Sequence, residues 1–457
     1  MEHNDLPKEW ITTPIKTLFS FVLGGDWGKD PLKFKDKDYE LALCIRGSEI
    51  KNWETKNSST AVERLIKKPS LEKRTLIPGD VLIEISGGGP DQPVGRTIYI
   101  DKNSLINDKD IPLVCTNFLR MMRFHPSLNS KYIQQYLQLF YDSGSIIKYQ
   151  GGSNNLRNLK FRDFETIKIP IAPRPEQVRI VAKVDILMTQ VETIKKSLER
   201  IPQLLKDFRQ QVLTQAVTGK LTEEWRTVNN IKEWEEDKFK NLVDYDTGPA
   251  FKSKEFTDTG IKLLRGQNIE PRALRWKDVK YFDKSKLENL KNLFINEGDV
   301  ILAMDRPIIS TGLKVAIAKK KDLPCVLVQR VCRFKETNRM NNKFLYYIIK
   351  SRKFISHLFQ NQTGTQIPHI SGKQILAYKL FIPAVQEQKE IVRRVESLFT
   401  KADAIEQQYQ SLKTNIDTLP QAILHKAFKG ELVEQLDSDG DARDLLSEIH
   451  KLKTYKK

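Results

Sequence analysis

Apolar residues recur at alternating steps of four and three along two long stretches of the chain. In the first stretch, 176–221, they are Ile180, Val184, Leu187, Val191, Ile194, Leu198, Ile201, Leu205, Phe208 and Val212. In the second stretch, 387–432, they are Ile391, Val395, Leu398, Ala402, Ile405, Tyr409, Leu412, Ile416, Leu419 and Ile423. A period of about 3.5 residues is typical of helices that pair with other helices. The pattern therefore predicts two long helices. Each has an apolar stripe along one face, which we call the seam, and the two seams match.

The two stretches are copies of one another. Each opens on Glu-Gln and closes on Ala-x-x-Gly-x-Leu, which places Gly219 and Gly430 at the same point of the repeat. Glycines in this position are typical of residues that end a helix. Pro202 and Pro420 each remove a backbone hydrogen bond inside the helical pattern, so we expect a kink or a break at both.

The segments that precede the two helices also correspond. Lys-Glu-Trp occurs at 8–10 and 232–234, and Gly-Asp-Val occurs at 79–81 and 298–300. Gly-Asp followed by apolar residues indicates a turn that leads into a buried strand. We interpret the chain as an α+β protein in which two similar globular domains are each followed by a long helix. The predicted bounds are 1–172 and 223–383 for the globular domains, 173–222 and 384–436 for the helices, and 437–457 for a polar tail.

If the helices pair, they must run in opposite directions. The second domain begins soon after Leu221, at the far end of the first helix, and the second helix starts from that domain. Its seam can meet the first seam only by running back, which relates the two halves by a pseudo-two-fold axis. The predicted coiled-coil-like spacer has these pairing residues: Ile180, Val184, Leu187, Val191, Ile194, Ile391, Val395, Leu398, Ile405 and Leu412.

The net charge indicates the class of partner. The chain has 76 Lys and Arg against 58 Asp and Glu, a net charge of +18. A surplus of this size favours a polyanion such as nucleic acid over a charge that serves solubility alone. Double-stranded DNA is the partner we expect from the two similar domains held at opposite ends of paired helices. No apolar run approaches the roughly 20 residues of a membrane span, and no secretory signal opens the chain. We expect a cytoplasmic protein with no membrane partner.

Sequence motifs for catalysis are missing. There is no Asn/Asp-Pro-Pro-aromatic tetrapeptide, by which amino-methyltransferases hold their target amine, and no GxxxxGK[ST] phosphate-binding loop. The six histidines lack HxxxH and HExxH spacing, so we expect no metal site. Asp80 and Glu84 have part of the spacing of a nuclease centre, but we interpret them as residues at the edge of a strand. We therefore expect a chain without catalytic residues.

In this order of domains and helices, the chain resembles the specificity subunits of type I restriction–modification systems. The Glu-Gln and Ala-x-x-Gly-x-Leu motifs carry the resemblance, which covers roughly residues 6–435. It implies that two target recognition domains read an asymmetric bipartite DNA sequence, one half-site each. It also implies two adenine-methyltransferase subunits docked on the helices and domains, and ATP-dependent restriction subunits that translocate DNA. S-adenosylmethionine, ATP and Mg would then bind to those partners, and no cofactor to this chain.

Polar residues of the globular domains are candidates for reading bases, because Arg and Lys pair with guanine edges and phosphates, and Asn and Gln with adenine. In the first domain we select Arg96, Arg120, Gln150, Ser153, Asn154, Asn155 and Arg157. In the second we select Arg265, Gln267, Asn268, Arg306, Thr311, Arg330, Gln366 and His369. Each is equally compatible with a solvated loop residue or a turn former.

Two other classes of protein stay open at this point. One is a single-chain restriction or methyltransferase enzyme with its own active site, which methyl transfer by the purified chain alone would support. The other is a coiled-coil scaffold that binds no DNA. The sequence does not give the recognised bases, the length of the unread spacer or the role of the tail.

Overall fold

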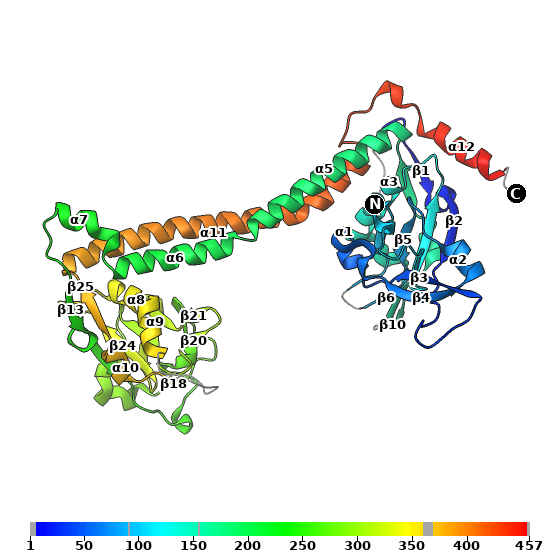
Figure 1. The fold of residues 1–457 in the computed structure, drawn as a ribbon. Coiled ribbons are helices and arrows are strands. Elements are labelled where there is room, and N and C mark those ends of the chain that lie inside the picture. Colours follow the sequence, from blue (N-terminus) through cyan, green and yellow to red (C-terminus); the bar gives the residue numbers. More distant parts are fainter. Residues whose placement is uncertain (1–5, 90–91, 154–155, 360–368, 455–457) are drawn as a thin grey trace. The chain divides into compact units, whose positions relative to one another are not determined.

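The computed structural model describes residues 6–89, 92–153, 156–359 and 369–454. It divides into two compact units, which Figure 1 shows in colours that follow the sequence. Unit 1 comprises 1–198 and 412–457, and unit 2 comprises 199–411. Each unit therefore combines a globular α+β region with part of both long helical stretches.

Unit 1 is built on an antiparallel sheet of four strands. In sheet order they are β2 (Phe19–Gly24), β9 (Leu119–Phe124), β5 (Val81–Glu84) and β7 (Thr97–Tyr99). The second sheet contains β4 (Val62–Lys67), β3 (Tyr39–Ile45) and β8 (Leu113–Cys115), and the third contains β10 (Gln150–Ser153), β11 (Leu156–Leu159) and β6 (Ser86–Gly88). A separate pair is formed by β1 (Ile11–Pro14) and β12 (Lys168–Ile171). Helix α3 (Ser130–Asp142) packs against β5 and β7.

Unit 2 repeats this topology. Its four-stranded sheet is β14 (Asp244–Thr247), β24 (Val331–Lys335), β19 (Val300–Ala303) and β22 (Val315–Ile317). Its three-stranded sheet is β18 (Tyr281–Phe282), β15 (Ile261–Leu264) and β23 (Cys325–Leu327), and β13 (Glu235–Lys238) pairs with β25 (Lys379–Ile382). Short hairpins join β16 (Ile269–Glu270) to β17 (Ala273–Leu274) and β20 (Ile308–Ile309) to β21 (Gly312–Leu313). Helices α8 (Asn342–Lys350), α9 (Arg352–Phe359) and α10 (Gly372–Leu376) follow the sheets. The predicted duplication and α+β class are confirmed.

The Gly-Asp-Val motifs begin the two central strands. All four residues of β5 and all four of β19 are buried. The Asp80 carboxylate accepts a hydrogen bond from the amide of Ile77 (2.9 Å), and the Asp299 carboxylate accepts one from the amide of Asn296 (2.8 Å). Each aspartate thus closes the turn that precedes its strand. Because these carboxylates hold turns, their role is structural.

The first long helical stretch is interrupted and the second is continuous. Helix α5 (Arg174–Leu198) ends before α6 (Ile201–Val217), which begins with Pro202 in its first turn, so the expected break is confirmed there. Helix α11 (Val385–Phe428) runs through Pro420 without a break. The loss of one hydrogen bond does not end this helix of 44 residues. Gly219 and Gly430 both have φ of +76°, as expected of residues that end helices.

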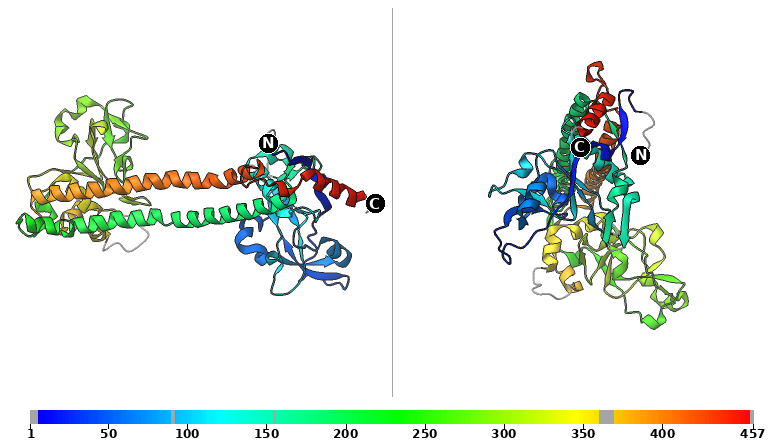
Figure 2. Two further views of the ribbon diagram at one scale, coloured as in Figure 1. Left: turned by 90° about the horizontal axis from the view of Figure 1, so that it is seen from above. Right: turned by 90° about the vertical axis from the view of Figure 1, so that its right-hand side faces the viewer.

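In unit 2, α6 and the first part of α11 run antiparallel. The carbonyl of Leu221, just after α6, accepts from Nη1 of Arg394 (2.8 Å). Earlier on α6, Nη2 of Arg209 donates to Asp403 (2.6 Å) and to Glu406 (2.7 Å). Residue numbers therefore fall along one helix as they rise along the other. Figure 1 and Figure 2 both show these green and orange segments side by side.

In unit 1, α5 and the last part of α11 have the same relation. Phe428, the last residue of α11, packs on Tyr132 and Tyr136 of α3, with ring centroids 4.9 and 5.2 Å apart. The residues that follow reach the first turns of α5, where Arg179 forms an ion pair with Asp439 (2.6 Å). The end of α11 therefore lies at the beginning of α5, as an antiparallel arrangement requires.

One column of the predicted seam is buried along its length, and the other is buried only in part. Every seventh residue is buried, namely Val184, Val191, Leu198, Leu205 and Val212 in the first stretch and Val395, Ala402, Tyr409, Ile416 and Ile423 in the second. Ile180 and Ile391 are also buried, and Leu187 and Leu398 are half-buried. Ile194, Ile405 and Leu412 expose 40%, 48% and 45% of their surface, so these predicted pairing residues are only partly covered. A 3.5-residue period predicts that both columns are apolar, but it does not say how many partners cover them.

The C-terminal tail belongs to unit 1. Helix α12 (Ala442–Thr454) begins where the amide of Ala442 donates to the carbonyl of Glu9 (3.0 Å). Ser127 donates to Glu448 from the globular region (2.8 Å), and Ile449 is fully buried. The polar tail is therefore an ordered helix in this fold. None of the helices in the described ranges combines the length and apolar character of a membrane crossing.

Candidate nucleic-acid interface

The two units share one pattern of backbone hydrogen bonds at the ends of their central strands, β5 and β19, which we call the backbone frame. In unit 1 the amide of Glu84 donates to the carbonyl of Arg96 (2.9 Å). In unit 2 the amide of Ala303 donates to the carbonyl of Lys314 (3.0 Å). Glu84 therefore corresponds to Ala303, and Arg96 corresponds to Lys314.

The next residue of each strand extends this correspondence. The amide of Ile85 donates to the carbonyl of Phe118, and the amide of Met304 donates to the carbonyl of Arg330, both at 2.9 Å. Phe118 and Arg330 thus occupy matching places.

A third pairing completes the frame. Ser86 pairs with Asn158 between β6 and β11, and Asp305 pairs with His369 in an isolated bridge. Ser86 therefore matches Asp305, and Asn158 matches His369. The backbone is the same in both units, but none of the matched side chains is.

In unit 2 these places form a cationic group that we call the Asp305 cluster: Asp305, Arg306, Lys314, Arg330 and His369. The Asp305 carboxylate lies 3.0 Å from Nη1 of Arg330 and 2.9 Å from Nδ1 of His369. Arg306 and Arg330 have φ of +45° and +62°, a region that non-glycine residues rarely adopt and that is enriched at functional sites. Two arginines and one lysine against one carboxylate give this cluster a net positive charge, which suits phosphates and guanine edges.

Unit 1 presents neutral groups at three of the matching places. Asn158 is exposed, Ser86 is half-buried and Phe118 exposes 49% of its surface. Arg157 is half-buried on β11 beside Asn158. The face of unit 1 thus offers amide, hydroxyl and aromatic groups where unit 2 offers charge.

Two predicted base-reading residues are held in structural contacts, which corrects their assignment. Nε and Nη2 of Arg96 donate to Glu84 at 2.9 and 2.6 Å. Burial lowers the pKa of Arg96, but the hydrogen bonds and charge of Glu84 outweigh it and raise that pKa. Asn268 is fully buried, accepts from the amide of Arg265 (3.2 Å) and donates to the carbonyl of Arg275 (3.0 Å). Its amide closes a turn and is not available to a base.

Two further predicted arginines are partly engaged. The guanidinium of Arg120 lies 4.2 Å from the ring centroid of Phe161, and burial lowers its pKa. Nη2 of Arg265 donates to the carbonyl of Asp278 (2.5 Å), and burial again lowers the pKa. Both keep donor groups that a ligand could use.

The other predicted residues lie in different surroundings. Gln267, Arg306, Thr311, Arg330 and His369 are exposed in unit 2, and three of them belong to the Asp305 cluster. In unit 1, Gln150 donates to the carbonyl of Val94 (3.3 Å), and Ser153 is the last residue of β10. Asn154, Asn155 and Gln366 lie outside the described residues.

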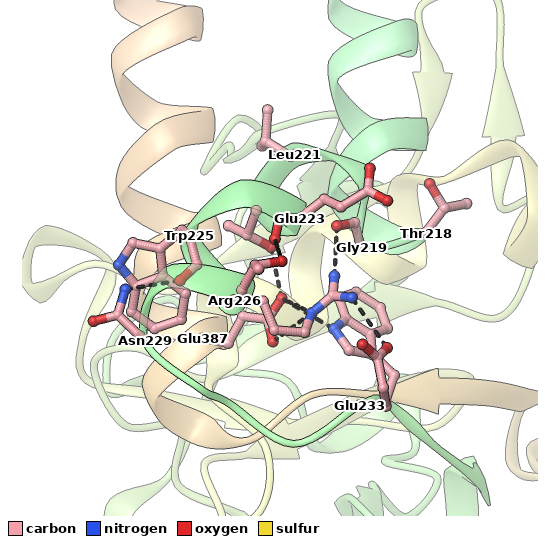
Figure 3. A network of polar contacts seen from close by, with 12 residues as sticks. Thr218, Gly219, Leu221, Glu223, Trp225, Arg226, Asn229, Glu233 and Glu387 are labelled. Atoms are coloured by element: carbon pink, nitrogen blue, oxygen red, sulfur yellow. Dashed lines mark hydrogen bonds and ion pairs between the residues drawn. The ribbon is translucent and has the colours of Figure 1, made fainter.

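The Glu-Gln motif builds a joint between helix and domain. In unit 2, Glu387 is fully buried and accepts from Thr222 (2.7 Å), Nε of Arg226 (3.1 Å) and Nε1 of Trp234 (3.0 Å). Figure 3 shows the contact between Arg226 and Glu387. Nη2 of Arg226 also donates to the carbonyl of Gly219 (2.7 Å). One arginine therefore links the end of α6 to the start of α11.

Unit 1 contains the same joint with a neutral link. Glu176 is buried and accepts from Nε1 of Trp10 (2.8 Å) and Nε2 of Gln435 (3.0 Å). The same Gln435 amide donates to the carbonyl of Gly430 (2.8 Å). Burial raises the pKa of Glu176, and the two hydrogen bonds oppose it. The repeated Lys-Glu-Trp, Glu-Gln and glycine motifs thus meet in one structural device.

Sequence reasoning missed Lys314, Asp305, Phe118 and Asn158. Part of their signal is present in the sequence repeat, because counting from the two Gly-Asp-Val motifs aligns β5 with β19 and the residues that follow each strand. The pairs that lie across the sheets require the strand register, which the sequence does not supply. Over the described part of the chain, no group of three His, Cys, Asp or Glu side chains could hold a metal ion.

Comparison with known proteins gives consistent matches. The description "Type I restriction modification DNA specificity domain" matches residues 7–203 and 231–414. The type I restriction enzyme EcoKI specificity subunit of Escherichia coli (strain K12) is 29% identical, over 98% of this chain and 94% of that protein. The StySPI specificity subunit of Salmonella potsdam is 28% identical over the same shares. The crystal structure of the HsdS subunit from Thermoanaerobacter tengcongensis has the same fold, with a TM-score of 0.63 at 17% identity and coverage of 93% and 98%.

Proposed function

The chain belongs to the family of type I restriction–modification DNA specificity subunits, and we propose that it reads an asymmetric bipartite target in double-stranded DNA. Each unit takes one half-site, and the chain itself catalyses no reaction. The matched backbone frame with unlike side chains supports this proposal most strongly. Arg330 and His369 stand in unit 2 where Phe118 and Asn158 stand in unit 1. Different donors and acceptors at matching places of the two units select different bases.

The long helices set the spacing between half-sites and dock two adenine-methyltransferase subunits. The partly covered column of the seam supports a docking role, because apolar residues in a row on a helix pair favour a protein partner. In unit 1 this column includes Ile194 and Leu412, and in unit 2 it includes Phe208 and Ile405. Restriction subunits that translocate DNA join that core. S-adenosylmethionine, ATP and Mg bind to the partner subunits in this assembly.

The direct test is a genome-wide map of methylated adenines in the host, with and without this gene. We expect one split motif to lose methylation on deletion and to regain it when the gene is restored. An unchanged map would contradict the function, and methyl transfer by the purified chain alone would contradict the noncatalytic role.

A variant of unit 2 assigns the half-sites. Arg330→Ala removes an exposed guanidinium from the Asp305 cluster, so we expect a relaxed or altered base preference in one half of the motif only. Arg275→Ala is the matched control, since Arg275 is an exposed arginine of unit 2 that pairs with Glu270 (2.8 Å) outside the cluster. Methylation maps of the two variants would give the result.

A further inference from the structure

Lys314 is a buried lysine at the edge of the Asp305 cluster. It directly precedes β22, and its amide donates to the carbonyl of Pro307 (2.7 Å). Only 9% of its surface is exposed. Its ammonium points towards Gly266, where a Cβ would lie 4.0 Å from Nζ.

The matching cation of unit 1 is neutralised by its neighbour. Arg96 forms an ion pair with Glu84 at 2.6 Å. In unit 2 the residue that matches Glu84 is Ala303, so this carboxylate is missing from the same place. The ammonium of Lys314 forms no hydrogen bond or ion pair with any residue in the described ranges.

The nearest carboxylate does not replace Glu84. Asp305 is already bound by Arg330 and His369. Burial lowers the pKa of Lys314, the charge of Asp305 opposes this, and Arg306 adds to it. The stem of Lys314 is therefore packed in the protein, while its ammonium keeps three donors that an acceptor outside the chain can use.

We propose that Lys314 donates to an acceptor of the bound DNA duplex, either a phosphate oxygen or the O6 and N7 edge of a guanine. This inference rests on the proposed function and adds one contact residue to unit 2. Gly266 leaves the approach to the ammonium open, since it has no side chain to cover Nζ. The Asp305 cluster then offers three cations to the duplex, whereas the matching arginine of unit 1 stays within the protein.

The test uses the purified full chain and a duplex that carries the methylated motif found in the host. The variant is Lys314→Met, which keeps the length of the side chain and removes the charge. It should fold like the parent chain, because the packed stem is replaced by an apolar side chain and no side-chain hydrogen bond is lost. Lys350→Met is the matched control, because Lys350 is another shielded lysine of unit 2, 4.9 Å from the Tyr346 ring and outside the cluster.

We expect Lys314→Met to weaken binding by about tenfold, the range of one good contact. If the acceptor is a phosphate, the motif stays the same and the slope of log K against log salt becomes shallower by about 0.9. If the acceptor is a guanine, the motif relaxes at one position of a single half-site. Lys350→Met should bind like the parent chain.

Unchanged affinity, salt slope and motif in Lys314→Met would overturn this contact while leaving the proposed function intact. A parent chain that binds no duplex, together with an unchanged methylation map on deletion of the gene, would overturn the proposed function itself. The two failures are therefore distinguishable.

Discussion

Unit 1 and unit 2 hold the same backbone frame but present different chemistry on it. Where unit 2 carries Arg330 and His369, unit 1 carries Phe118 and Asn158. Inside the units the opposite is true, because Trp10 and Trp234 each donate to a buried glutamate at the start of a long helix. The comparison teaches that scaffold positions repeat while outward positions diverge, so a new specificity requires new side chains and not a new fold.

The largest effect should come from the joint of unit 2. Glu387→Ala removes the acceptor of the Trp234 and Thr222 donors and of Nε of Arg226, whose side chain is only 12% exposed, so we expect the free energy of unfolding to fall by about 3–5 kcal/mol. In unit 1, Glu176→Ala removes hydrogen bonds from neutral donors only and should cost about 1–3 kcal/mol. Urea unfolding of the full chain measures both. A greater loss in Glu176→Ala would contradict the charge-based difference between the joints.

Two adjacent leucines of α6, one in the seam and one outside it, allow a comparison within one turn. Leu205 exposes 7% of its surface and Leu204 exposes 63%. Leu205→Ala should lower the free energy of unfolding by about 2 kcal/mol, whereas Leu204→Ala should change it by under about 0.5 kcal/mol. Equal losses in thermal unfolding would show that burial does not distinguish these two leucines.

A third change makes unit 1 more like unit 2. Glu84→Gln removes the charge that holds Arg96, so we expect the arginine to become available to DNA, with a salt slope steeper by up to about 0.9. The free energy of unfolding should fall by about 1–2 kcal/mol, since the pair is largely shielded from solvent. Salt titrations of duplex binding test this. A slope equal to that of the parent chain would mean that Arg96 lies away from the duplex.

The smallest expected effect is a dependence of folding stability on pH, which comes from Glu176 in unit 1. Burial raises the pKa of Glu176 above its ordinary 4.5. The folded state therefore binds this proton more tightly than the unfolded chain, and stability is gained as the pH falls through the raised pKa towards 4.5. Above the raised pKa the gain is absent. Glu176→Gln cannot titrate, so the parent chain should gain stability over this variant as the pH falls from neutral. A constant difference would contradict the raised pKa.

The sequence predicted the repeated elements well because they depend on local periodicity. The helices, the break at Pro202 and the turns before β5 and β19 each follow from spacing within a few residues. The continuity of α11 through Pro420 could not be predicted, because neighbouring packing decides whether a helix survives one lost hydrogen bond. The partial exposure of Ile194 could not be predicted either, since an apolar pattern does not reveal whether a partner covers each apolar side chain.

The candidate interface was less accessible to sequence reasoning. Side-chain chemistry selected Arg330 and His369, which the structure brings together at Asp305. It also selected Arg96 and Asn268, although both are bound to neighbours inside the protein. A base-reading arginine and a structural arginine have the same letter in the sequence. Only the structure distinguishes the two roles, through the strand register and the buried partner of the side chain.

The most direct measurement is the methylation map of a chimaera in which residues 1–172 are replaced by the corresponding domain of another family member. The account predicts that one half of the split motif changes and that the other half and the spacer length are retained. A change in both halves, or in neither, would contradict the claim that the two units read their half-sites independently.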